Sequence, residues 1–205
     1  DRDEPRVKTP IVAQIKAVWR DGRLWFLSLF YFVTFGAFVA LTVYLPNFLT
    51  SHYAMDGVSA GMATSVFIVA AAAVRVLGGW LADRFDCYRL LALVFAGIVA
   101  GAAVLAVAPG LPVYLAGIYL ISLACGIGNG VVFKLVPTYF TKQAGLANGI
   151  VSMMGGLGGF FPPLVLSTSM LLFGTNVPGL AAFGAFALAC LAIALAMHGR
   201  KQAEA

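Results

Sequence analysis

The sequence of 205 residues is 61% hydrophobic and only 10% charged, whereas about a quarter of the residues are charged in an ordinary soluble domain. This composition excludes a soluble globular protein and predicts a helical membrane bundle. The formal net charge of +5 does not indicate nucleic-acid binding, because the basic residues are scattered between apolar stretches and form no stripe.

Residues 1–23 are expected to form a cytoplasmic linker that carries a short amphipathic helix. Thr9-Pro10 resembles a helix start, and apolar residues then recur on one face. We expect this helix to lie on the membrane surface as a linker, with a regulatory or lipid-binding element as the alternative. The sequence begins with neither an initiator Met nor a signal-peptide pattern, so it reads as a fragment.

Residues 24–198 contain six apolar stretches that are each long enough to cross a hydrocarbon core of about 30 Å as a helix. Each stretch is far longer than the strands of a membrane β-barrel. The predicted fold is therefore an all-α membrane protein of six transmembrane helices, followed by a cytoplasmic tail at residues 199–205. The expected spans are 24–49, 58–82, 90–108, 113–139, 144–171 and 178–197.

Lysines and arginines alternate between the connections of these spans. They lie in the leading segment, the second and fourth connections and the tail, whereas the first, third and fifth connections carry none. Because cytoplasmic loops of membrane proteins are enriched in basic residues, we expect a multi-pass protein of the plasma (inner) membrane with both ends in the cytoplasm.

Arg75 is the strongest candidate for a functional residue. It lies within the second span, about 12 Å along the helix from Asp83, where an arginine costs at least ~2.5 kcal/mol. All eight acidic residues lie in expected loops or tails, so no carboxylate of this sequence is placed to neutralise it. An unpaired guanidinium attracts a planar anion. The alternative is a charge that snorkels to the interface or pairs within the bundle.

Other side-chain chemistry is sparse. The spans contain no Asp, Glu or His, so any proton coupling would use the anion itself, water or residues outside this sequence. The three cysteines are widely spaced, and no cluster of metal ligands or catalytic residues recurs. We therefore expect no metal, no cofactor and no enzymatic activity.

Glycines concentrate in the fourth and fifth spans. In the fifth span, Pro162-Pro163 follows shortly after the glycine run, and this proline pair predicts a bend in the helix. Close packing and cavity lining are both consistent with these glycines, and a phosphate-binding loop is excluded because no strand precedes them. The glycines expected to form a flexible helix are Gly149, Gly155, Gly156, Gly158 and Gly159.

Four further residues are candidates for contact with a substrate. Asn129 and Ser152 are polar groups inside spans, where they either form interhelical hydrogen bonds or bind the substrate. Tyr31 and Phe35 lie four residues apart on one helix face, where they either pack against a flat ligand or fill the bundle.

One loop motif resembles a known family signature. Residues 79–85 (GWLADRF), followed by Arg89, resemble the cytoplasmic loop signature of the major facilitator superfamily and lie between the second and third spans as in that fold. The sequence departs from the signature at Asp86, where the family usually has glycine. The resemblance implies the C-terminal six-helix half of such a transporter.

Within that superfamily, the sequence resembles the nitrate/nitrite porters over nearly its whole length. The matching segments are residues 31–36 (YFVTFG), Arg75 before Gly78-Gly79, residues 126–137 (GIGNGVVFKLVP) and residues 149–162 (GIVSMMGGLGGFFP). They resemble the seventh, eighth, tenth and eleventh helices of that family.

The resemblance implies transport of nitrate or nitrite by alternating access. It implies that Arg75 binds the anion together with a second arginine from the N-terminal half, that Tyr31 and Phe35 border the ligand, and that the glycine helix flexes. The partners it implies are the anion, the lipid bilayer and the N-terminal six-helix half. The alternatives are transport of another small anion, such as an organic carboxylate or phosphate ester, and a non-transporting membrane subunit.

Overall fold

The structure, a computed structural model, describes residues 11–107, 110–175 and 177–203. Helices and short connections account for these residues, with no strand among them. The elements in chain order are α1 (Ile11–Arg20), α2 (Gly22–Tyr53), α3 (Gly57–Arg84), α4 (Cys87–Val107), α5 (Leu111–Tyr139), η1 (Thr141–Gln143), α6 (Ala144–Gly158), α7 (Phe161–Phe173) and α8 (Val177–Ala203).

The described residues contain six helical spans that are long and apolar enough to cross a membrane, as the sequence predicts. They are α2, α3, α4, α5, the η1–α6–α7 segment and α8 up to Arg200. The protein is therefore a multi-pass membrane protein with an all-helical fold.

Polar side chains define the ends of several spans. Asp56 caps the N-terminus of α3, where its carboxylate accepts hydrogen bonds from the backbone amides of Val58 and Ser59 at 3.0 and 2.9 Å. Hydrogen bonds from the side chain and backbone of Ser59 hold the pKa of Asp56 below its ordinary value. The cap satisfies amides that have no partner within the helix.

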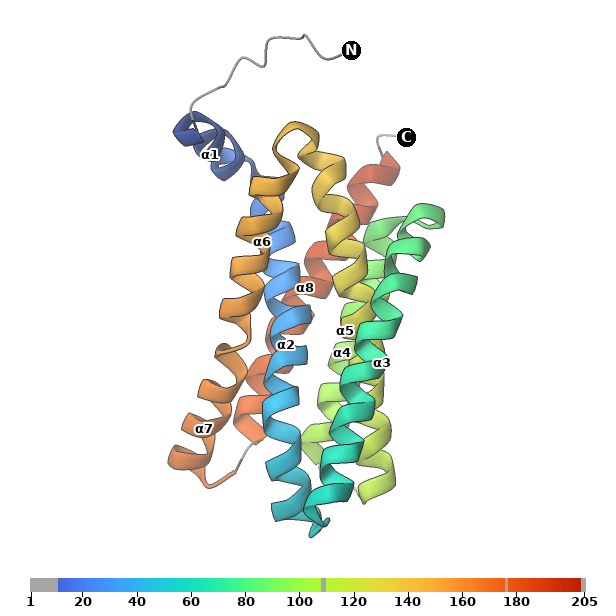
Figure 1. The fold of residues 1–205 in the computed structure, drawn as a ribbon, viewed down its shortest axis with the longest axis vertical. Helices are drawn as coiled ribbons and strands as arrows, with labels where there is room; N and C mark the ends of the chain where they lie inside the picture. Colours follow the sequence, from blue (N-terminus) through green and yellow to red (C-terminus); the bar gives the residue numbers. More distant parts are fainter. Residues whose placement is uncertain (1–10, 108–109, 176, 204–205) are drawn as a thin grey trace.

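The fifth span is broken near its middle, as the Pro162-Pro163 pair predicts. Helix α6 ends at Gly158, and α7 begins at Phe161 after a single turn (Figure 1). Proline has no amide hydrogen and fixes its φ angle, so both prolines fit in the first turn of α7 but not inside a continuous helix.

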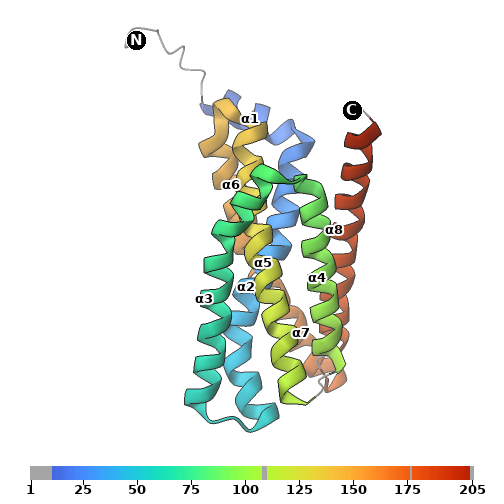
Figure 2. The same ribbon diagram turned by 90° about the vertical axis from the view of Figure 1, so that its right-hand side faces the viewer.

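Helices α2 and α5 are in contact, and the other spans pack around them. Helix α3 packs on α5, α6 packs on α2, and α4 packs on α8 (Figures 1 and 2). The first three spans and the last three thus pair in the same way, because the second helix of each set packs on the first helix of the other.

Glycines permit the close approach of α3 and α5. A Cβ atom at Gly78 would lie 2.8 Å from the Ile127 Cα, and one at Gly126 would lie 3.1 Å from the Ala71 Cα. Because these distances are shorter than van der Waals contact, any larger residue would push the two backbones apart.

Helix α1 and the last turns of α8 lie at the same end of the bundle (Figures 1 and 2). The α3–α4 and α5–α6 connections also lie at this end, which we call the basic end because it carries Arg20, Arg23, Arg84, Arg89, Lys142 and Arg200. In the sequence, the connections at the opposite end contain no Lys or Arg.

Helix α1 is held against the start of α2. The Val18 side chain is buried, and the Trp25 indole donates a hydrogen bond of 3.0 Å to the Trp19 carbonyl oxygen. The two indole rings meet edge to face, with centroids 4.6 Å apart. The expected helix start at Thr9-Pro10 lies outside the described residues.

Candidate functional site

Arg75 lies in the C-terminal half of α3, about 13 Å along the helix axis from Arg84 at the end of that helix. Its Nη2 atom donates a hydrogen bond of 3.2 Å to the Tyr31 hydroxyl oxygen on α2. Its Cζ atom lies 4.9 Å from the centre of the Phe133 ring on α5. The partly buried guanidinium thus lies where three helices meet.

The aromatic side chains around Arg75 also contact one another. Tyr31 stacks on Phe35 with ring centroids 5.0 Å apart and an interplanar angle of 14°. Tyr31 and Phe133 meet edge to face, with ring centroids 4.9 Å apart and an interplanar angle of 86°. Two residues singled out from the sequence, Tyr31 and Phe35, therefore form one cluster with Arg75.

Phe133 was not identified as a candidate from the sequence. It follows Asn129 by four residues in the 126–137 segment, and residues four apart share a helix face. This spacing from a polar residue was the one sequence feature that could have identified Phe133. A cation over an aromatic face is stabilised by the ring quadrupole, and Phe133 provides such a face for the Arg75 guanidinium.

The charge of Arg75 has no acidic partner within the described part of the chain, where its only hydrogen bond is to Tyr31. Lys134, the residue after Phe133, forms an ion pair with Asp83 at the end of α3. The two cations differ, because the charge of Lys134 is balanced and that of Arg75 is not. An uncompensated guanidinium with several free donors is suited to a planar oxyanion.

The predicted glycine helix divides into packed and open positions. A Cβ atom at Gly155 would lie 3.3 Å from the Cγ atom of Tyr31 and closer still to the edge of its ring. Gly158 and Gly159 likewise lie close to α2, whereas the positions of Gly149 and Gly156 have nothing within 4 Å. The absence of side chains at the packed positions brings α6 against the Tyr31 ring.

Asn129 and Ser152 have different surroundings. The Thr34 hydroxyl on α2 donates a hydrogen bond of 2.8 Å to the Asn129 Oδ1 atom on α5, and both residues are buried. This is the interhelical hydrogen bond that was one of the two alternatives for Asn129. Ser152 is exposed on α6, as are Gly149 and Gly156, and it remains a prediction for substrate contact.

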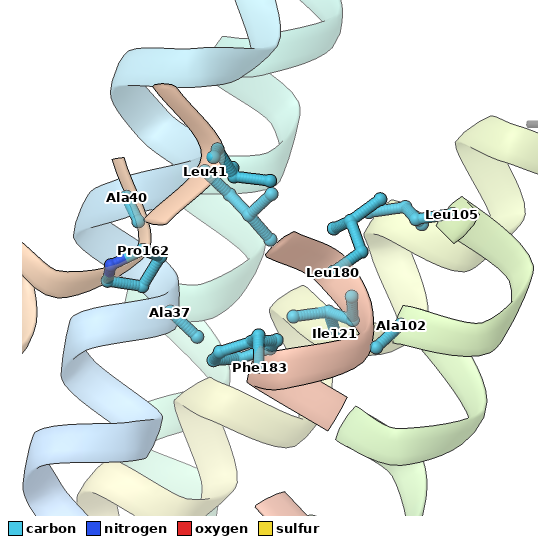
Figure 3. A pocket seen from close by; sticks show the side chains of 10 residues that line it. Ala37, Ala40, Leu41, Ala102, Leu105, Ile121, Pro162, Leu180 and Phe183 are labelled. Carbon is cyan, nitrogen blue, oxygen red and sulfur yellow. The ribbon is translucent and has the colours of Figure 1, made fainter. Parts of the chain in front are cut away.

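An apolar cavity of about 20 Å³ lies elsewhere in the bundle, between α2, α4, α5, α7 and α8 (Figure 3). Figure 3 shows Leu41, Leu180 and Phe183 beside this space. No titratable side chain lines it, and it has room for about one water molecule. It is therefore a packing void and is separate from the Arg75 cluster.

Six long apolar spans in the described residues, with a partly buried arginine where α2, α3 and α5 meet, define the class of this molecule as a multi-pass membrane protein that carries a positive charge within its bundle. Comparison with known proteins specifies the family. Residues 1–163 match the Major Facilitator Superfamily, and the chain belongs to this family.

Curated relatives are similar over most of the chain. The nitrite extrusion protein of Bacillus subtilis is 48% identical over 202 residues, which are 98% of this chain and 51% of that protein. The probable nitrate transporter NarT of Staphylococcus epidermidis is 46% identical over 196 residues, or 92% of this chain and 49% of the relative. The corresponding protein of Staphylococcus haemolyticus is 46% identical over 167 residues, or 82% of this chain and 43% of the relative. The chain spans about half the length of the curated relatives it matches.

Proposed function

We propose that this chain is the C-terminal six-helix half of a transporter for nitrate or nitrite. The observation that carries the proposal is the Arg75 guanidinium, which has no carboxylate partner in the described part of the chain and lies beside the rings of Tyr31 and Phe133. The names of the relatives add support, because proteins 48% and 46% identical to this chain are named a nitrite extrusion protein and a probable nitrate transporter.

The chemistry of the cluster fits a small planar monoanion. A guanidinium presents a flat fork of N–H donors that matches two oxygens of such an anion. The stacked rings of Tyr31 and Phe35 provide a flat surface beside that fork. Larger dianions call for more than one cation in this half, and Lys134 is already paired with Asp83.

The site is completed in this proposal by the N-terminal half of the same transporter, which supplies a second arginine. Alternating access then proceeds by rocking of the two halves around the anion at the middle of the membrane. The break between α6 and α7 and the open positions at Gly149 and Gly156 support movement along this face. In this proposal the protein lies in the plasma membrane, and the positive-inside rule supports a cytoplasmic location for the basic end.

Anion competition in proteoliposomes tests the substrate. The full-length transporter is reconstituted, loaded with unlabelled nitrate and assayed for exchange with isotopically labelled nitrate outside. We expect exchange that external nitrite inhibits at concentrations similar to nitrate, while phosphate inhibits it far less.

Two results contradict the proposal. Exchange of acetate or phosphate in the absence of nitrate exchange assigns the site to another small anion. A reconstituted, correctly folded transporter that exchanges none of these anions above the rate of protein-free liposomes supports the alternative of a non-transporting membrane subunit.

A further inference from the structure

A second cavity, of about 450 Å³, opens at the basic end of the bundle between α2, α4, α5 and α8. Figure 2 shows α4 and α8 side by side as they approach this end. Phe26, Ile193 and Met197 give the cavity an apolar wall, while Tyr88, Tyr139 and Arg200 contribute polar groups. Its volume is within the range of ligand-binding pockets, and its lining is amphipathic.

Polar groups lie in and beside this cavity. The hydroxyl oxygens of Tyr88 and Tyr139 lie 2.7 Å apart and form a hydrogen bond. The Cζ atom of Arg23 lies 5.3 Å from the centre of the Tyr139 ring. Arg200 lines the cavity from α8. The Arg200 guanidinium and the pair of hydroxyls therefore provide donors for an anionic oxygen-rich group.

Nearby carboxylates are already engaged. Asp86 accepts hydrogen bonds from the backbone amides of Tyr88 and Arg89 at 3.1 and 3.0 Å, and its Oδ1 atom lies 2.9 Å from His198 Nδ1. Asp21 pairs with Arg23 at 3.1 Å. Arg200 has no ion pair within the described part of the chain, so its charge remains available to a ligand.

The depth of the cavity indicates the class of ligand. Tyr88 and Tyr139 belong to the first and last turns of α4 and α5, and Phe26 lies in the second turn of α2. Residues at such positions lie where lipid headgroups meet acyl chains, which is also where tyrosine is enriched in membrane proteins. Basic pockets between transmembrane helices at this level bind anionic lipid headgroups.

We propose that this cavity binds an anionic phospholipid. The phosphodiester contacts Arg200 and the Tyr88–Tyr139 hydroxyl pair, and the start of an acyl chain lies along Phe26 and Met197. This site is separate from Arg75 in position and in ligand, so the proposal does not depend on nitrate transport. Occupancy ties the end of α8 to α2 and α4, and it depends on the lipid composition of the membrane.

Native mass spectrometry of the full-length transporter tests the proposal. The delipidated protein is titrated with phosphatidylglycerol and, separately, with phosphatidylcholine of the same acyl chains. We expect preferential retention of phosphatidylglycerol. Arg200→Gln is expected to weaken this binding roughly fivefold, because each basic residue near a lipid surface contributes about one such factor.

Two pairs of matched variants separate this cavity from the general charge of the basic end. Ala196→Phe fills the cavity, whose lining includes Ala196, and is expected to abolish the preference. Its control, Leu195→Phe, alters an exposed neighbour on α8. Arg89→Gln is the control for Arg200→Gln, because Arg89 is exposed at the same end and outside the cavity. Both controls are expected to bind as the wild type does.

Three outcomes overturn the proposal. The first is equal retention of the two lipids by the wild type. The second is an equal loss in Arg200→Gln and Arg89→Gln, which shows attraction by diffuse surface charge. The third is displacement of phosphatidylglycerol by an equal concentration of glycerol 3-phosphate, which assigns the cavity to a soluble phosphate ester.

Discussion

Tyr31→Phe removes a single oxygen atom from the candidate anion site. That oxygen accepts the 3.2 Å hydrogen bond from Arg75. The ring that stacks on Phe35 and makes an edge-to-face contact with Phe133 is retained. The substitution therefore tests the hydroxyl apart from the packing of the aromatic cluster.

The expected magnitude follows from the geometry of this bond. Hydrogen bonds to charged groups contribute about 1.5–3 kcal/mol, and 3.2 Å is at the long end of the N–H···O range. Because Arg75 is only partly buried, water replaces part of the lost interaction, which leaves about 1 kcal/mol. We expect the Kd for nitrate to rise roughly fivefold.

Calorimetric titration of the purified full-length transporter with nitrate measures this change. Tyr119→Phe is the matched control, because the Tyr119 hydroxyl donates a comparable bond of 3.4 Å to the Ala63 carbonyl between α5 and α3. The reasoning is refuted if Tyr31→Phe binds nitrate as tightly as the wild type, or if the two variants lose the same affinity.

Phe133→Leu removes the aromatic face 4.9 Å from Arg75, and we expect nitrate affinity to fall about three- to fivefold, which corresponds to a partly exposed cation–π contact. Gly155→Ala places a Cβ atom against the edge of the Tyr31 ring, so we expect a large loss of nitrate uptake. Gly149→Ala, whose Cβ atom would have nothing within 4 Å, is expected to retain uptake. Asp56→Ala removes the cap of α3, and hydrogen exchange should show faster exchange of the first-turn amides than in the wild type at neutral pH. Because the pKa of Asp56 is lowered from 3.8 in the folded protein, this protection is complete above pH 3.8 and is lost as the pH falls through the folded-state value.

Each of these predictions has a result that contradicts it. Unchanged nitrate affinity in Phe133→Leu shows that the Phe133 ring does not contribute to anion binding. Equal uptake by Gly155→Ala and Gly149→Ala shows that α6 does not need its close approach to α2. Protection of the α3 amides that survives Asp56→Ala shows that the carboxylate does not hold the helix end.

The number and type of the spans follow from the sequence, which contains six apolar runs of membrane length. In lipid, a run of this length satisfies its own backbone hydrogen bonds only as a helix. Their ends are less predictable. The first span was expected to end at residue 49, yet α2 continues to Tyr53. Thr50 explains part of the extension, because its hydroxyl donates to the carbonyl oxygens of Pro46 and Asn47 in the preceding turn. A polar residue that suggests a loop in the sequence is thereby accommodated within the helix.

The chemistry of the site was only partly predictable. A census of charges is enough to single out Arg75, because it needs no knowledge of the packing. The contact with Phe133 depends on the register of α3 against α5, which glycines set at close approach: a Cβ atom at Gly130 would lie 2.7 Å from the Gly79 nitrogen. Such pairings between residues distant in sequence are not contained in any local pattern.

The hydrogen bond of Asn129 illustrates the same limit. The sequence shows that a buried amide needs a partner, but the partner, Thr34, is 95 positions away in the chain. The helix packing identifies this partner, while substrate contact by Asn129 stays a prediction. Ser152 is exposed on α6, and its contact with the substrate stays a prediction.

The central claim, that the Arg75 guanidinium binds the transported anion, is tested most directly by nitrate uptake in Arg75→Lys. The full-length transporter carrying this substitution is reconstituted beside Arg89→Lys, which makes the same exchange at an exposed position of the basic end. A lysine keeps the charge but lacks the planar fork of donors. We predict that Arg75→Lys loses nitrate uptake by about tenfold or more while Arg89→Lys retains it. Undiminished uptake in Arg75→Lys contradicts the account.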